Sequence, residues 1–342
     1  MALPHLRWHD PRMSRNQTID HASRAFFVTT GPHVAEIQRT APPSKLSLRL
    51  ELDTGQSITF QPAERMDDFA GYSCFRAMQG DWTVWFRSNA TRGEVIVERG
   101  ALTSDHGRAQ RVGPYKAIVL RDDTPIAQLD IPFHDWFTRW RWPTQMDQDI
   151  EILAQSLDAR LNIPIDPEID GSDNAFEVTK YEGPFRNRHG IEDYFPTSGE
   201  RGDIGFYTEW VAEYLKTGKR RELETILVHA ETHAQFPNHI RLPTGRWLDF
   251  STEQAFGYPN GITYALLDAH WNQRDKPFAL VGQSDVETFF RIDVAHYPSI
   301  CWVPWLVTGD IFYLEELQAA VIGHLVDQGF VPNELGLVNV AQ

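Results

Sequence analysis

The period of the hydrophobic pattern changes near residue 145, and this change constrains the fold more than any other feature of the sequence. From about residue 23 to 143 the period is two, which is typical of strands with one face toward solvent. In Lys45–Leu52, for example, leucine occupies every even position. Asp53–Gly55 then predicts a turn and Ser57–Phe60 a second strand, so we expect a β-hairpin here.

Four more stretches in this region have the composition of strands and are separated by Gly- and Asp-rich turns. They are Trp82–Phe86, Glu94–Glu98, Lys116–Leu120 and Ile126–Leu129. Many short strands without an intervening helical pattern favour an antiparallel β-sandwich. We therefore predict an N-terminal arm over residues 1–22 and a β-sandwich domain over residues 23–143.

The predicted sandwich ends in an aromatic segment. Its tryptophans are Trp136, Trp140 and Trp142, and two arginines, Arg139 and Arg141, are interleaved with them. The rings have two interpretations, a platform on which a sugar stacks or packing between the sandwich and a following helical domain. We favour the second, because aromatic side chains dominate packed contacts.

After residue 143 the pattern takes the period of an α-helix. Thr144 and Asp147 resemble a capping box, and apolar residues follow at helical spacing from Met146 to Leu161. Residues 162–198 contain several Pro and Gly residues and predict a long loop. Loops of this length in compact domains are usually functional or mobile.

An internal repeat organises the second half of the chain. Tyr214–Glu224 aligns without a gap with Trp305–Glu315, and both copies pass through Thr-Gly into a second amphipathic stretch. Gly218 and Gly309 permit a positive φ at a helix C-terminus. Each copy therefore predicts a pair of helices, and stacked pairs form either a solenoid or a closed α/α barrel.

Composition narrows the classes of partner. The chain carries 47 acidic and 32 basic residues, a formal charge of −15, which disfavours nucleic acid and anionic membranes. No run reaches the ~18 apolar residues of a membrane span, and the N-terminus lacks the apolar run of a signal peptide. A cytoplasmic location is the default, with export of a longer parent left open. Cys74 and Cys301 match no zinc or disulfide pattern, and no pattern predicts a cofactor.

Several segments resemble a group of large bacterial proteins. The segments are Arg139–Trp142, Arg201–Gly205, Phe236–His239, His296–Asp310 and Tyr313–Gln318. Through them, roughly the second two-thirds of the chain is similar to the exo-rhamnogalacturonan-lyase-like group. The resemblance implies a β-sandwich followed by an α/α toroid, and a carbohydrate-active protein that takes a polysaccharide or oligosaccharide.

A complete toroid of this kind has about twelve helices and needs well over ~200 residues at usual helix and loop lengths. We therefore expect the helical domain over residues 144–342 to be incomplete and the chain to be the front portion of a longer protein. An unfinished toroid exposes an apolar flank, which invites self-association or a partner chain.

Two histidines, His229 and His233, lie four residues apart on a predicted helix with Glu231 between them. A third ligand such as His239 or Glu192 would complete a metal site, but the order differs from the zinc motif His-Glu-x-x-His. We favour the alternative of a partly exposed last helical turn, where cationic histidine complements the helix dipole.

Three clusters of polar residues in predicted loops form the candidate site, because loops between helices build the mouth of an α/α toroid. The clusters are Arg188, His189 and Glu192; Arg201, Asp203 and Tyr207; and His239, Arg241, Trp247 and Asp249, with Tyr258 downstream and His296 before a predicted helix. Ordinary loop polarity explains any single member, and Asp203 also suits a helix N-cap.

A polysaccharide lyase removes the proton α to a uronate carboxylate, so it needs a base and a cation beside that carboxylate. His239, His296 or Tyr207 suits the first role. Arginine suits the second because its planar fork binds carboxylate bidentately. The candidate clamps are Arg188, Arg201 and Arg241.

An inverting glycoside hydrolase instead needs two carboxylates that flank the bond. The available carboxylates are Glu192, Asp193, Asp203 and Asp249, and Trp247 can stack on sugar in either scheme. The third hypothesis is a non-catalytic carbohydrate-binding or structural fragment. Of the three, we expect lyase-type chemistry on an acidic polysaccharide, with the hydrolase and the binding fragment as alternatives.

Overall fold

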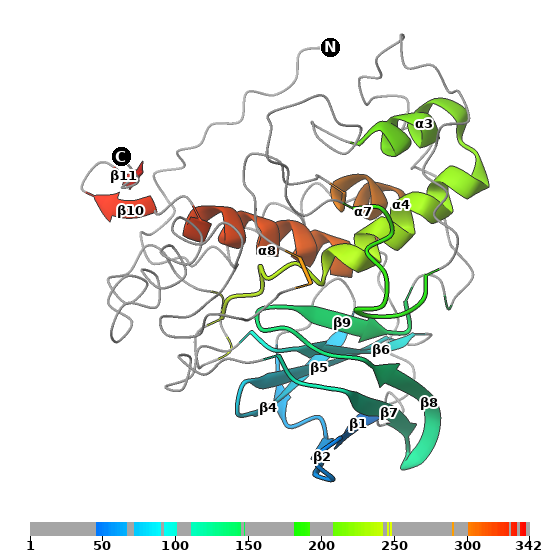
Figure 1. The fold of residues 1–342 in the computed structure, drawn as a ribbon, viewed down its shortest axis with the longest axis vertical. Helices are drawn as coiled ribbons and strands as arrows, with labels where there is room; N and C mark the ends of the chain where they lie inside the picture. The colour runs from blue at the N-terminus through cyan, green and yellow to red at the C-terminus, as the bar shows by residue number, and fades with distance from the viewer. Residues whose placement is uncertain are drawn as a thin grey trace.

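The computed structural model describes residues 46–66, 72–89, 92–100, 111–144, 147, 181–191, 208–241, 245, 247, 289–290, 300–327, 330–333 and 336–339. These residues form a mixed α+β fold with two large antiparallel sheets, four helices and a separate pair of short strands (Figure 1). The predicted N-terminal arm and the helix predicted from Met146 to Leu161 lie outside the described residues.

The first sheet has the strand order β2-β1-β7-β8. Its strands are β1 (Leu46–Leu52), β2 (Ser57–Phe60), β7 (Tyr115–Arg121) and β8 (Thr124–Ile131). The predicted hairpin is confirmed, since β1 and β2 pair antiparallel with Glu51 opposite Ser57. The alternation also holds, because Leu46, Leu48 and Leu50 are buried.

The second sheet has the order β3-β4-β5-β6-β9. Its strands are β3 (Glu64–Arg65), β4 (Ser73–Gln79), β5 (Trp82–Ser88), β6 (Gly93–Glu98) and β9 (Arg139–Trp142). The strands predicted around Trp82–Phe86 and Glu94–Glu98 are confirmed. Sequence analysis missed β4, and it treated β9 as an aromatic segment rather than a strand.

One hydrophobic cluster takes side chains from both sheets, among them Leu48, Phe86, Val95 and Val119. Trp140 of β9 belongs to this cluster, with 1% of its surface exposed, and its indole Nε1 donates to the Tyr115 hydroxyl at 2.8 Å. Neither interpretation of the tryptophans therefore fits Trp140, because it packs against both sheets and is closed to a sugar.

The internal repeat is confirmed as two pairs of helices. The first pair is α3 (Glu209–Thr217) and α4 (Arg220–His233), and the second is α7 (Trp302–Thr308) and α8 (Ile311–Asp327). Gly218 and Gly309 both adopt φ 66°, and their amides donate to the carbonyls of Tyr214 and Trp305. The Thr-Gly turns thus end the first helix of each pair as the sequence predicts.

A second cluster joins the helices to the sheet. It combines Ile96 of β6 with Leu223 and Ile226 of α4 and Phe312 of α8. In Figure 1, α4 and α8 lie beside the β6–β9 edge of the second sheet. This sheet therefore has one face toward the first sheet and the opposite face toward the helices.

The remaining elements are small. Thr144 donates its backbone amide to the Asp147 carboxylate at 2.8 Å, which is one half of the predicted capping box. A hairpin that sequence analysis did not single out, β10 (Phe330–Asn333) with β11 (Gly336–Asn339), follows α8. Among the described helices, none combines the length and apolar character that crossing a membrane requires.

Candidate functional site

The side chains of strand β9 point alternately to the two faces of the second sheet. Trp140 and Trp142 pack with the cluster between the sheets, so Arg139 and Arg141 lie on the opposite face, toward the helices. Both arginines are nearly or fully buried, and burying a guanidinium is unfavourable unless carboxylates pair with it. The helices supply those carboxylates.

Arg141 is the centre of one group of contacts. Its guanidinium forms a bidentate pair with Glu231 of α4 and reaches Asp310, ahead of α8, at 2.7 Å. The Tyr313 hydroxyl also donates to Glu231, at 2.9 Å. Burial opposes charge on Arg141, but Asp310 and Glu231 outweigh it and raise the pKa of the guanidinium well above its usual value. The strand is therefore ion-paired to both helical pairs.

Arg139 and Arg87 form the second group with two neighbouring residues of α8. Arg139 pairs with Glu316 and, at 2.9 Å, with Glu315, while Arg87 of β5 also pairs with Glu315. Burial alone would raise the pKa of Glu315, yet the two arginines lower it to about 2. Burial likewise opposes charge on Glu316, but Arg139 and His239 hold its pKa well below the usual range. We use the name buried network for Arg87, Arg139 and Arg141 with their carboxylate partners, His233 and His239.

His239, a predicted catalytic base, belongs to the buried network. Its Nε2 lies 3.1 Å from Glu316 Oε1 and its Nδ1 lies 3.0 Å from the Phe137 carbonyl oxygen. The side chain has no exposed surface. Because acceptors occupy both ring nitrogens, neither is free to take a proton from a substrate.

Arg241, a predicted clamp, is also occupied. It forms a bidentate pair with Glu98 of β6, and its guanidinium stacks 3.6 Å from the Trp247 ring centre and 4.9 Å from that of Trp85. Such stacking adds to the ion pair and fixes the guanidinium plane. Trp247 is partly exposed, but its ring already contacts Arg241.

The other described candidates lie in the 181–191 segment. Arg188 stacks over Phe289 and Phe290 at 5.4 and 5.3 Å. His189 adopts φ 53°, is 6% exposed, and its buried Nε2 has no hydrogen-bond partner. Burial lowers the pKa of this imidazole, which favours its neutral form.

The interpretation of His229 and His233 as a partly exposed helical turn is wrong, because both are at most 2% exposed. His229 Nε2 donates to the His189 carbonyl at 2.8 Å, and burial lowers the pKa of its ring to about 3. His233 Nδ1 instead meets Glu316. Within the described residues, no three His, Cys, Asp or Glu side chains are arranged to hold a metal ion.

The remaining predicted residues lie outside the described part of the chain. They are the catalytic candidates Asp193, Asp203, Tyr207, Asp249 and His296, and the binding candidates Glu192, Arg201 and Tyr258.

The buried network leaves little room for a ligand. A hollow of about 10 Å³ lies beside it, lined by Tyr72, Arg92, Glu94, Arg141 and Asp310 among others. That is about the space of one water molecule. Burial raises the pKa of Glu94 there, despite the nearby Arg87. The network therefore holds elements together, and this hollow is too small for a sugar.

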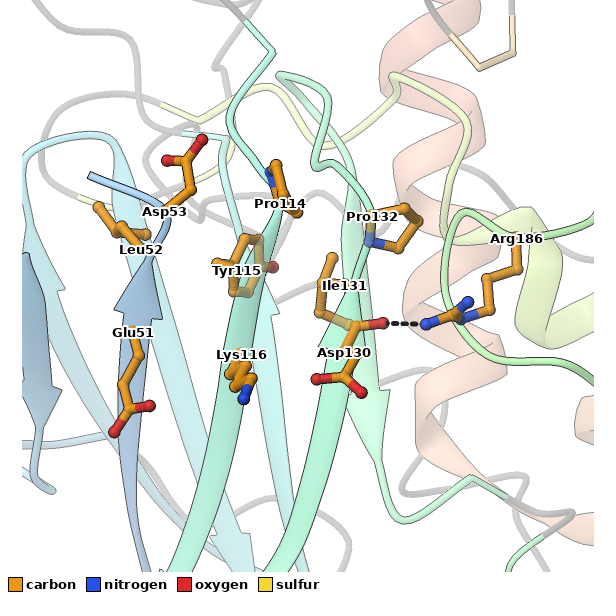
Figure 2. Close-up of a pocket in the computed structure, with 10 residues that line it drawn as sticks. All are labelled: Glu51, Leu52, Asp53, Pro114, Tyr115, Lys116, Asp130, Ile131, Pro132 and Arg186. Carbon is orange, nitrogen blue, oxygen red and sulfur yellow. Dashed lines mark hydrogen bonds between the residues drawn. The ribbon is translucent and has the colours of Figure 1, made fainter. Parts of the chain in front are cut away.

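An open hollow of about 440 Å³ lies on the first sheet. It is lined by Glu51, Leu52, Asp53, Pro114, Tyr115, Lys116, Asp130, Ile131, Pro132 and Arg186. Figure 2 shows the residues of β1, β7 and β8 and the two prolines at one end of these strands, with Arg186 on a separate segment beside them. We call this hollow the strand-end pocket. Its volume falls in the range of small-ligand sites.

Strand register builds the strand-end pocket. Lys116 of β7 lies opposite Glu51 of β1 and opposite Asp130 of β8. Arg186 continues this row, because its Nη2 donates to the Asp130 carbonyl oxygen at 2.7 Å (Figure 2). The pocket thus presents carboxylates and cations in alternation, beside the partly buried Pro132 and the exposed Pro114.

Sequence analysis did not select these pocket residues. The period-two pattern assigns Glu51 and Lys116 to the polar faces of predicted strands. It does not give the order of strands in the sheet, so nothing in the sequence indicates that the two are neighbours. Arg186 is close in sequence to the candidate Arg188. It reaches the first sheet from the 181–191 segment, which is far in sequence from β1, β7 and β8.

Comparisons of this chain with protein-family models, with curated proteins and with solved structures found no match.

Proposed function

We propose that this chain is a carbohydrate-active protein and that its described part binds a saccharide in the strand-end pocket. The observation that carries the proposal is the open volume of about 440 Å³, whose lining combines apolar surface with exposed donors and acceptors. Lys116, Asp130 and Arg186 are exposed, whereas the charged groups of the buried network are saturated by one another.

The chemistry of the pocket suits a sugar. A sugar hydroxyl both donates and accepts, so it pairs with carboxylates and with ammonium or guanidinium groups. Asp53 and Asp130 supply acceptors, and Lys116 and Arg186 supply donors. The rings of Pro114 and Pro132 offer apolar surface to the C–H groups of a pyranose.

We also propose the finer architecture that the resemblance implies. The hydrophobic cluster shared by the two sheets supports a β-sandwich. The two helical pairs support the beginning of an α/α toroid, since α4 packs against both α7 and α8.

Binding suits the described part better than catalysis does. A β-elimination needs a free base next to a free cation. His239 and Arg241, two residues expected to supply these groups, are committed to Glu316 and Glu98. Lyase chemistry on an acidic polysaccharide therefore depends on Tyr207 or His296 as the base and on Arg188 or Arg201 as the clamp.

The test is calorimetric titration of the full chain with a panel of neutral, amino and uronate oligosaccharides. We expect at least one to bind with a Kd in the micromolar to low millimolar range, and Lys116→Met to weaken that binding at least fivefold. Arg220→Met is the matched control, because Arg220 is an exposed cation of α4 paired only to Glu224 among the described residues. No binding by the whole panel, or binding unaffected by Lys116→Met, contradicts the proposal.

A further inference from the structure

We infer that the strand-end pocket selects an uncharged, hydroxyl-rich saccharide and discriminates against uronates. This inference rests on the proposed function, and it reverses the expectation of an acidic polysaccharide. It follows from the order of charges along the pocket.

Acidic residues lie opposite Lys116 on both neighbouring strands. Its register partners on both sides, Glu51 and Asp130, are carboxylates, and side chains on directly paired residues of adjacent strands lie about 5 Å apart. Carboxylates on both neighbouring strands lower the positive potential at the Lys116 ammonium, although neither forms an ion pair with it within the described residues. Lys116 therefore retains its hydrogen-bond donors but offers little net attraction to an anion.

Arg186 is similarly placed. One of its nitrogens donates to the main-chain carbonyl oxygen of Asp130, which holds the guanidinium against the backbone of β8 (Figure 2). A bidentate grip on a uronate needs both nitrogens of one edge and no competing anion nearby. The hydrogen bond to the main chain of Asp130 already occupies one nitrogen of Arg186.

The balance of charge points the same way. The lining contains three carboxylates, Glu51, Asp53 and Asp130, against two cations, Lys116 and Arg186, and Glu51 is also ion-paired to Arg49 at 3.2 Å. The lining therefore offers no surplus of cations to a uronate, on a chain of formal charge −15. A neutral hydroxyl instead bridges the alternating donors and acceptors without a repulsive cost.

The experiment compares chain-length-matched ligands by isothermal titration calorimetry of the full chain. The neutral probes are galactotetraose, cellotetraose and xylotetraose, and the acidic probe is the tetramer of galacturonic acid. We expect the best neutral tetramer to bind at least tenfold tighter than the acidic one. Its affinity should change less than twofold between 20 and 200 mM salt, because no net ion pair forms with it.

The outcomes separate the two proposals. Equal or tighter binding of the acidic tetramer overturns the inference and leaves the saccharide-binding proposal standing. If none of the four tetramers binds, the neutral-saccharide inference is overturned. The saccharide-binding proposal falls only if the wider panel of the previous section also fails to bind.

Charge-removing variants give a second test. Asp53→Asn with Asp130→Asn removes two carboxylates and keeps their size, so we expect the acidic tetramer to bind at least fivefold tighter than to the wild type. Unchanged binding of the acidic tetramer overturns the inference. Thermal melting confirms that the variant is folded, and Glu224→Gln on the distant helix α4 serves as the matched control.

Discussion

Two regions of this molecule are rich in charged residues, which are buried in one region and exposed in the other. In the buried network, Arg87, Arg139 and Arg141 pair with carboxylates of α4 and α8 and leave about 10 Å³ of free space. In the strand-end pocket, exposed Lys116, Asp130 and Arg186 border about 440 Å³. Charged residues thus serve cohesion in the buried network, where they are saturated, and we propose that they serve recognition in the strand-end pocket, where they face solvent.

The difference also predicts how each region responds to mutation. A buried ion pair contributes little beyond a hydrophobic replacement of both partners, but removing one partner leaves an uncompensated charge. An exposed charge has water as a substitute partner. Substitutions in the buried network should therefore affect stability, and those in the strand-end pocket should affect binding.

The largest effect is expected for Arg141→Met, because this substitution removes the cation that pairs with the buried carboxylates of Glu231 and Asp310. We predict a loss of roughly 3–5 kcal/mol in the free energy of unfolding. Urea denaturation followed by tryptophan fluorescence measures it.

The matched control for this prediction is Arg220→Met, whose partner Glu224 is exposed. It should cost less than about 1 kcal/mol. A similar cost for both variants would contradict the structural role of the buried network.

The next largest effect is on acid stability. The folded-state pKa of Glu315 is depressed to about 2, so the stability it contributes is present above the unfolded pKa near 4.5 and is lost as pH falls toward 2. The side chain is 21% exposed, and the shift corresponds to on the order of 3 kcal/mol.

Urea unfolding of the wild type and of Glu315→Gln between pH 6 and pH 2.5 tests this. The wild type should lose stability steeply below about pH 4.5, and the variant should start lower and lose less. Parallel pH profiles would show that Glu315 does not contribute to the acid transition.

A smaller effect is expected at the two turns of the repeat. Gly218→Ala and Gly309→Ala place a Cβ at φ 66°, which costs about 1–2 kcal/mol each. Asparagine tolerates this conformation better, so Gly218→Asn and Gly309→Asn should lose clearly less. Thermal melting of the four variants measures the difference, and a loss at only one turn would contradict the equivalence of the two copies.

The smallest effect on stability is expected in the strand-end pocket. Lys116→Met changes one exposed side chain, so its melting temperature should stay within about 2 °C of the wild type. A large drop would mean that the row of charges supports the sheet and is not a free recognition surface.

Local patterns predicted much of the fold. The leucines of β1, the strands around Trp82–Phe86 and Glu94–Glu98, and the Thr-Gly turns all follow from periodicity and backbone preference. The pattern did not reveal β4, whose sequence Ser-Cys-Phe-Arg-Ala-Met-Gln lacks a clean alternation. It also did not show that β9 directs its arginines to the helices, because that depends on the strand's place in the sheet.

The candidate site was harder to predict, because it depends on contacts between distant segments. His239 and Arg241 were sound candidates by residue type, but their partners Glu316 and Glu98 are 77 and 143 positions away in sequence. Glu51, Lys116 and Asp130 become neighbours only through strand order. The sequence shows the chemical type of each side chain. It does not show which side chains are already paired or which lie close together.

The most direct measurement is a titration of the isotopically labelled chain with a neutral tetrasaccharide, followed by amide chemical shifts. We predict saturable shifts at Glu51, Asp53, Lys116, Asp130 and Arg186, with His233, His239 and Glu316 unmoved. Shifts centred on His239 and Glu316, with none along β1, β7 and β8, would contradict the division between a cohesive network and a recognising pocket.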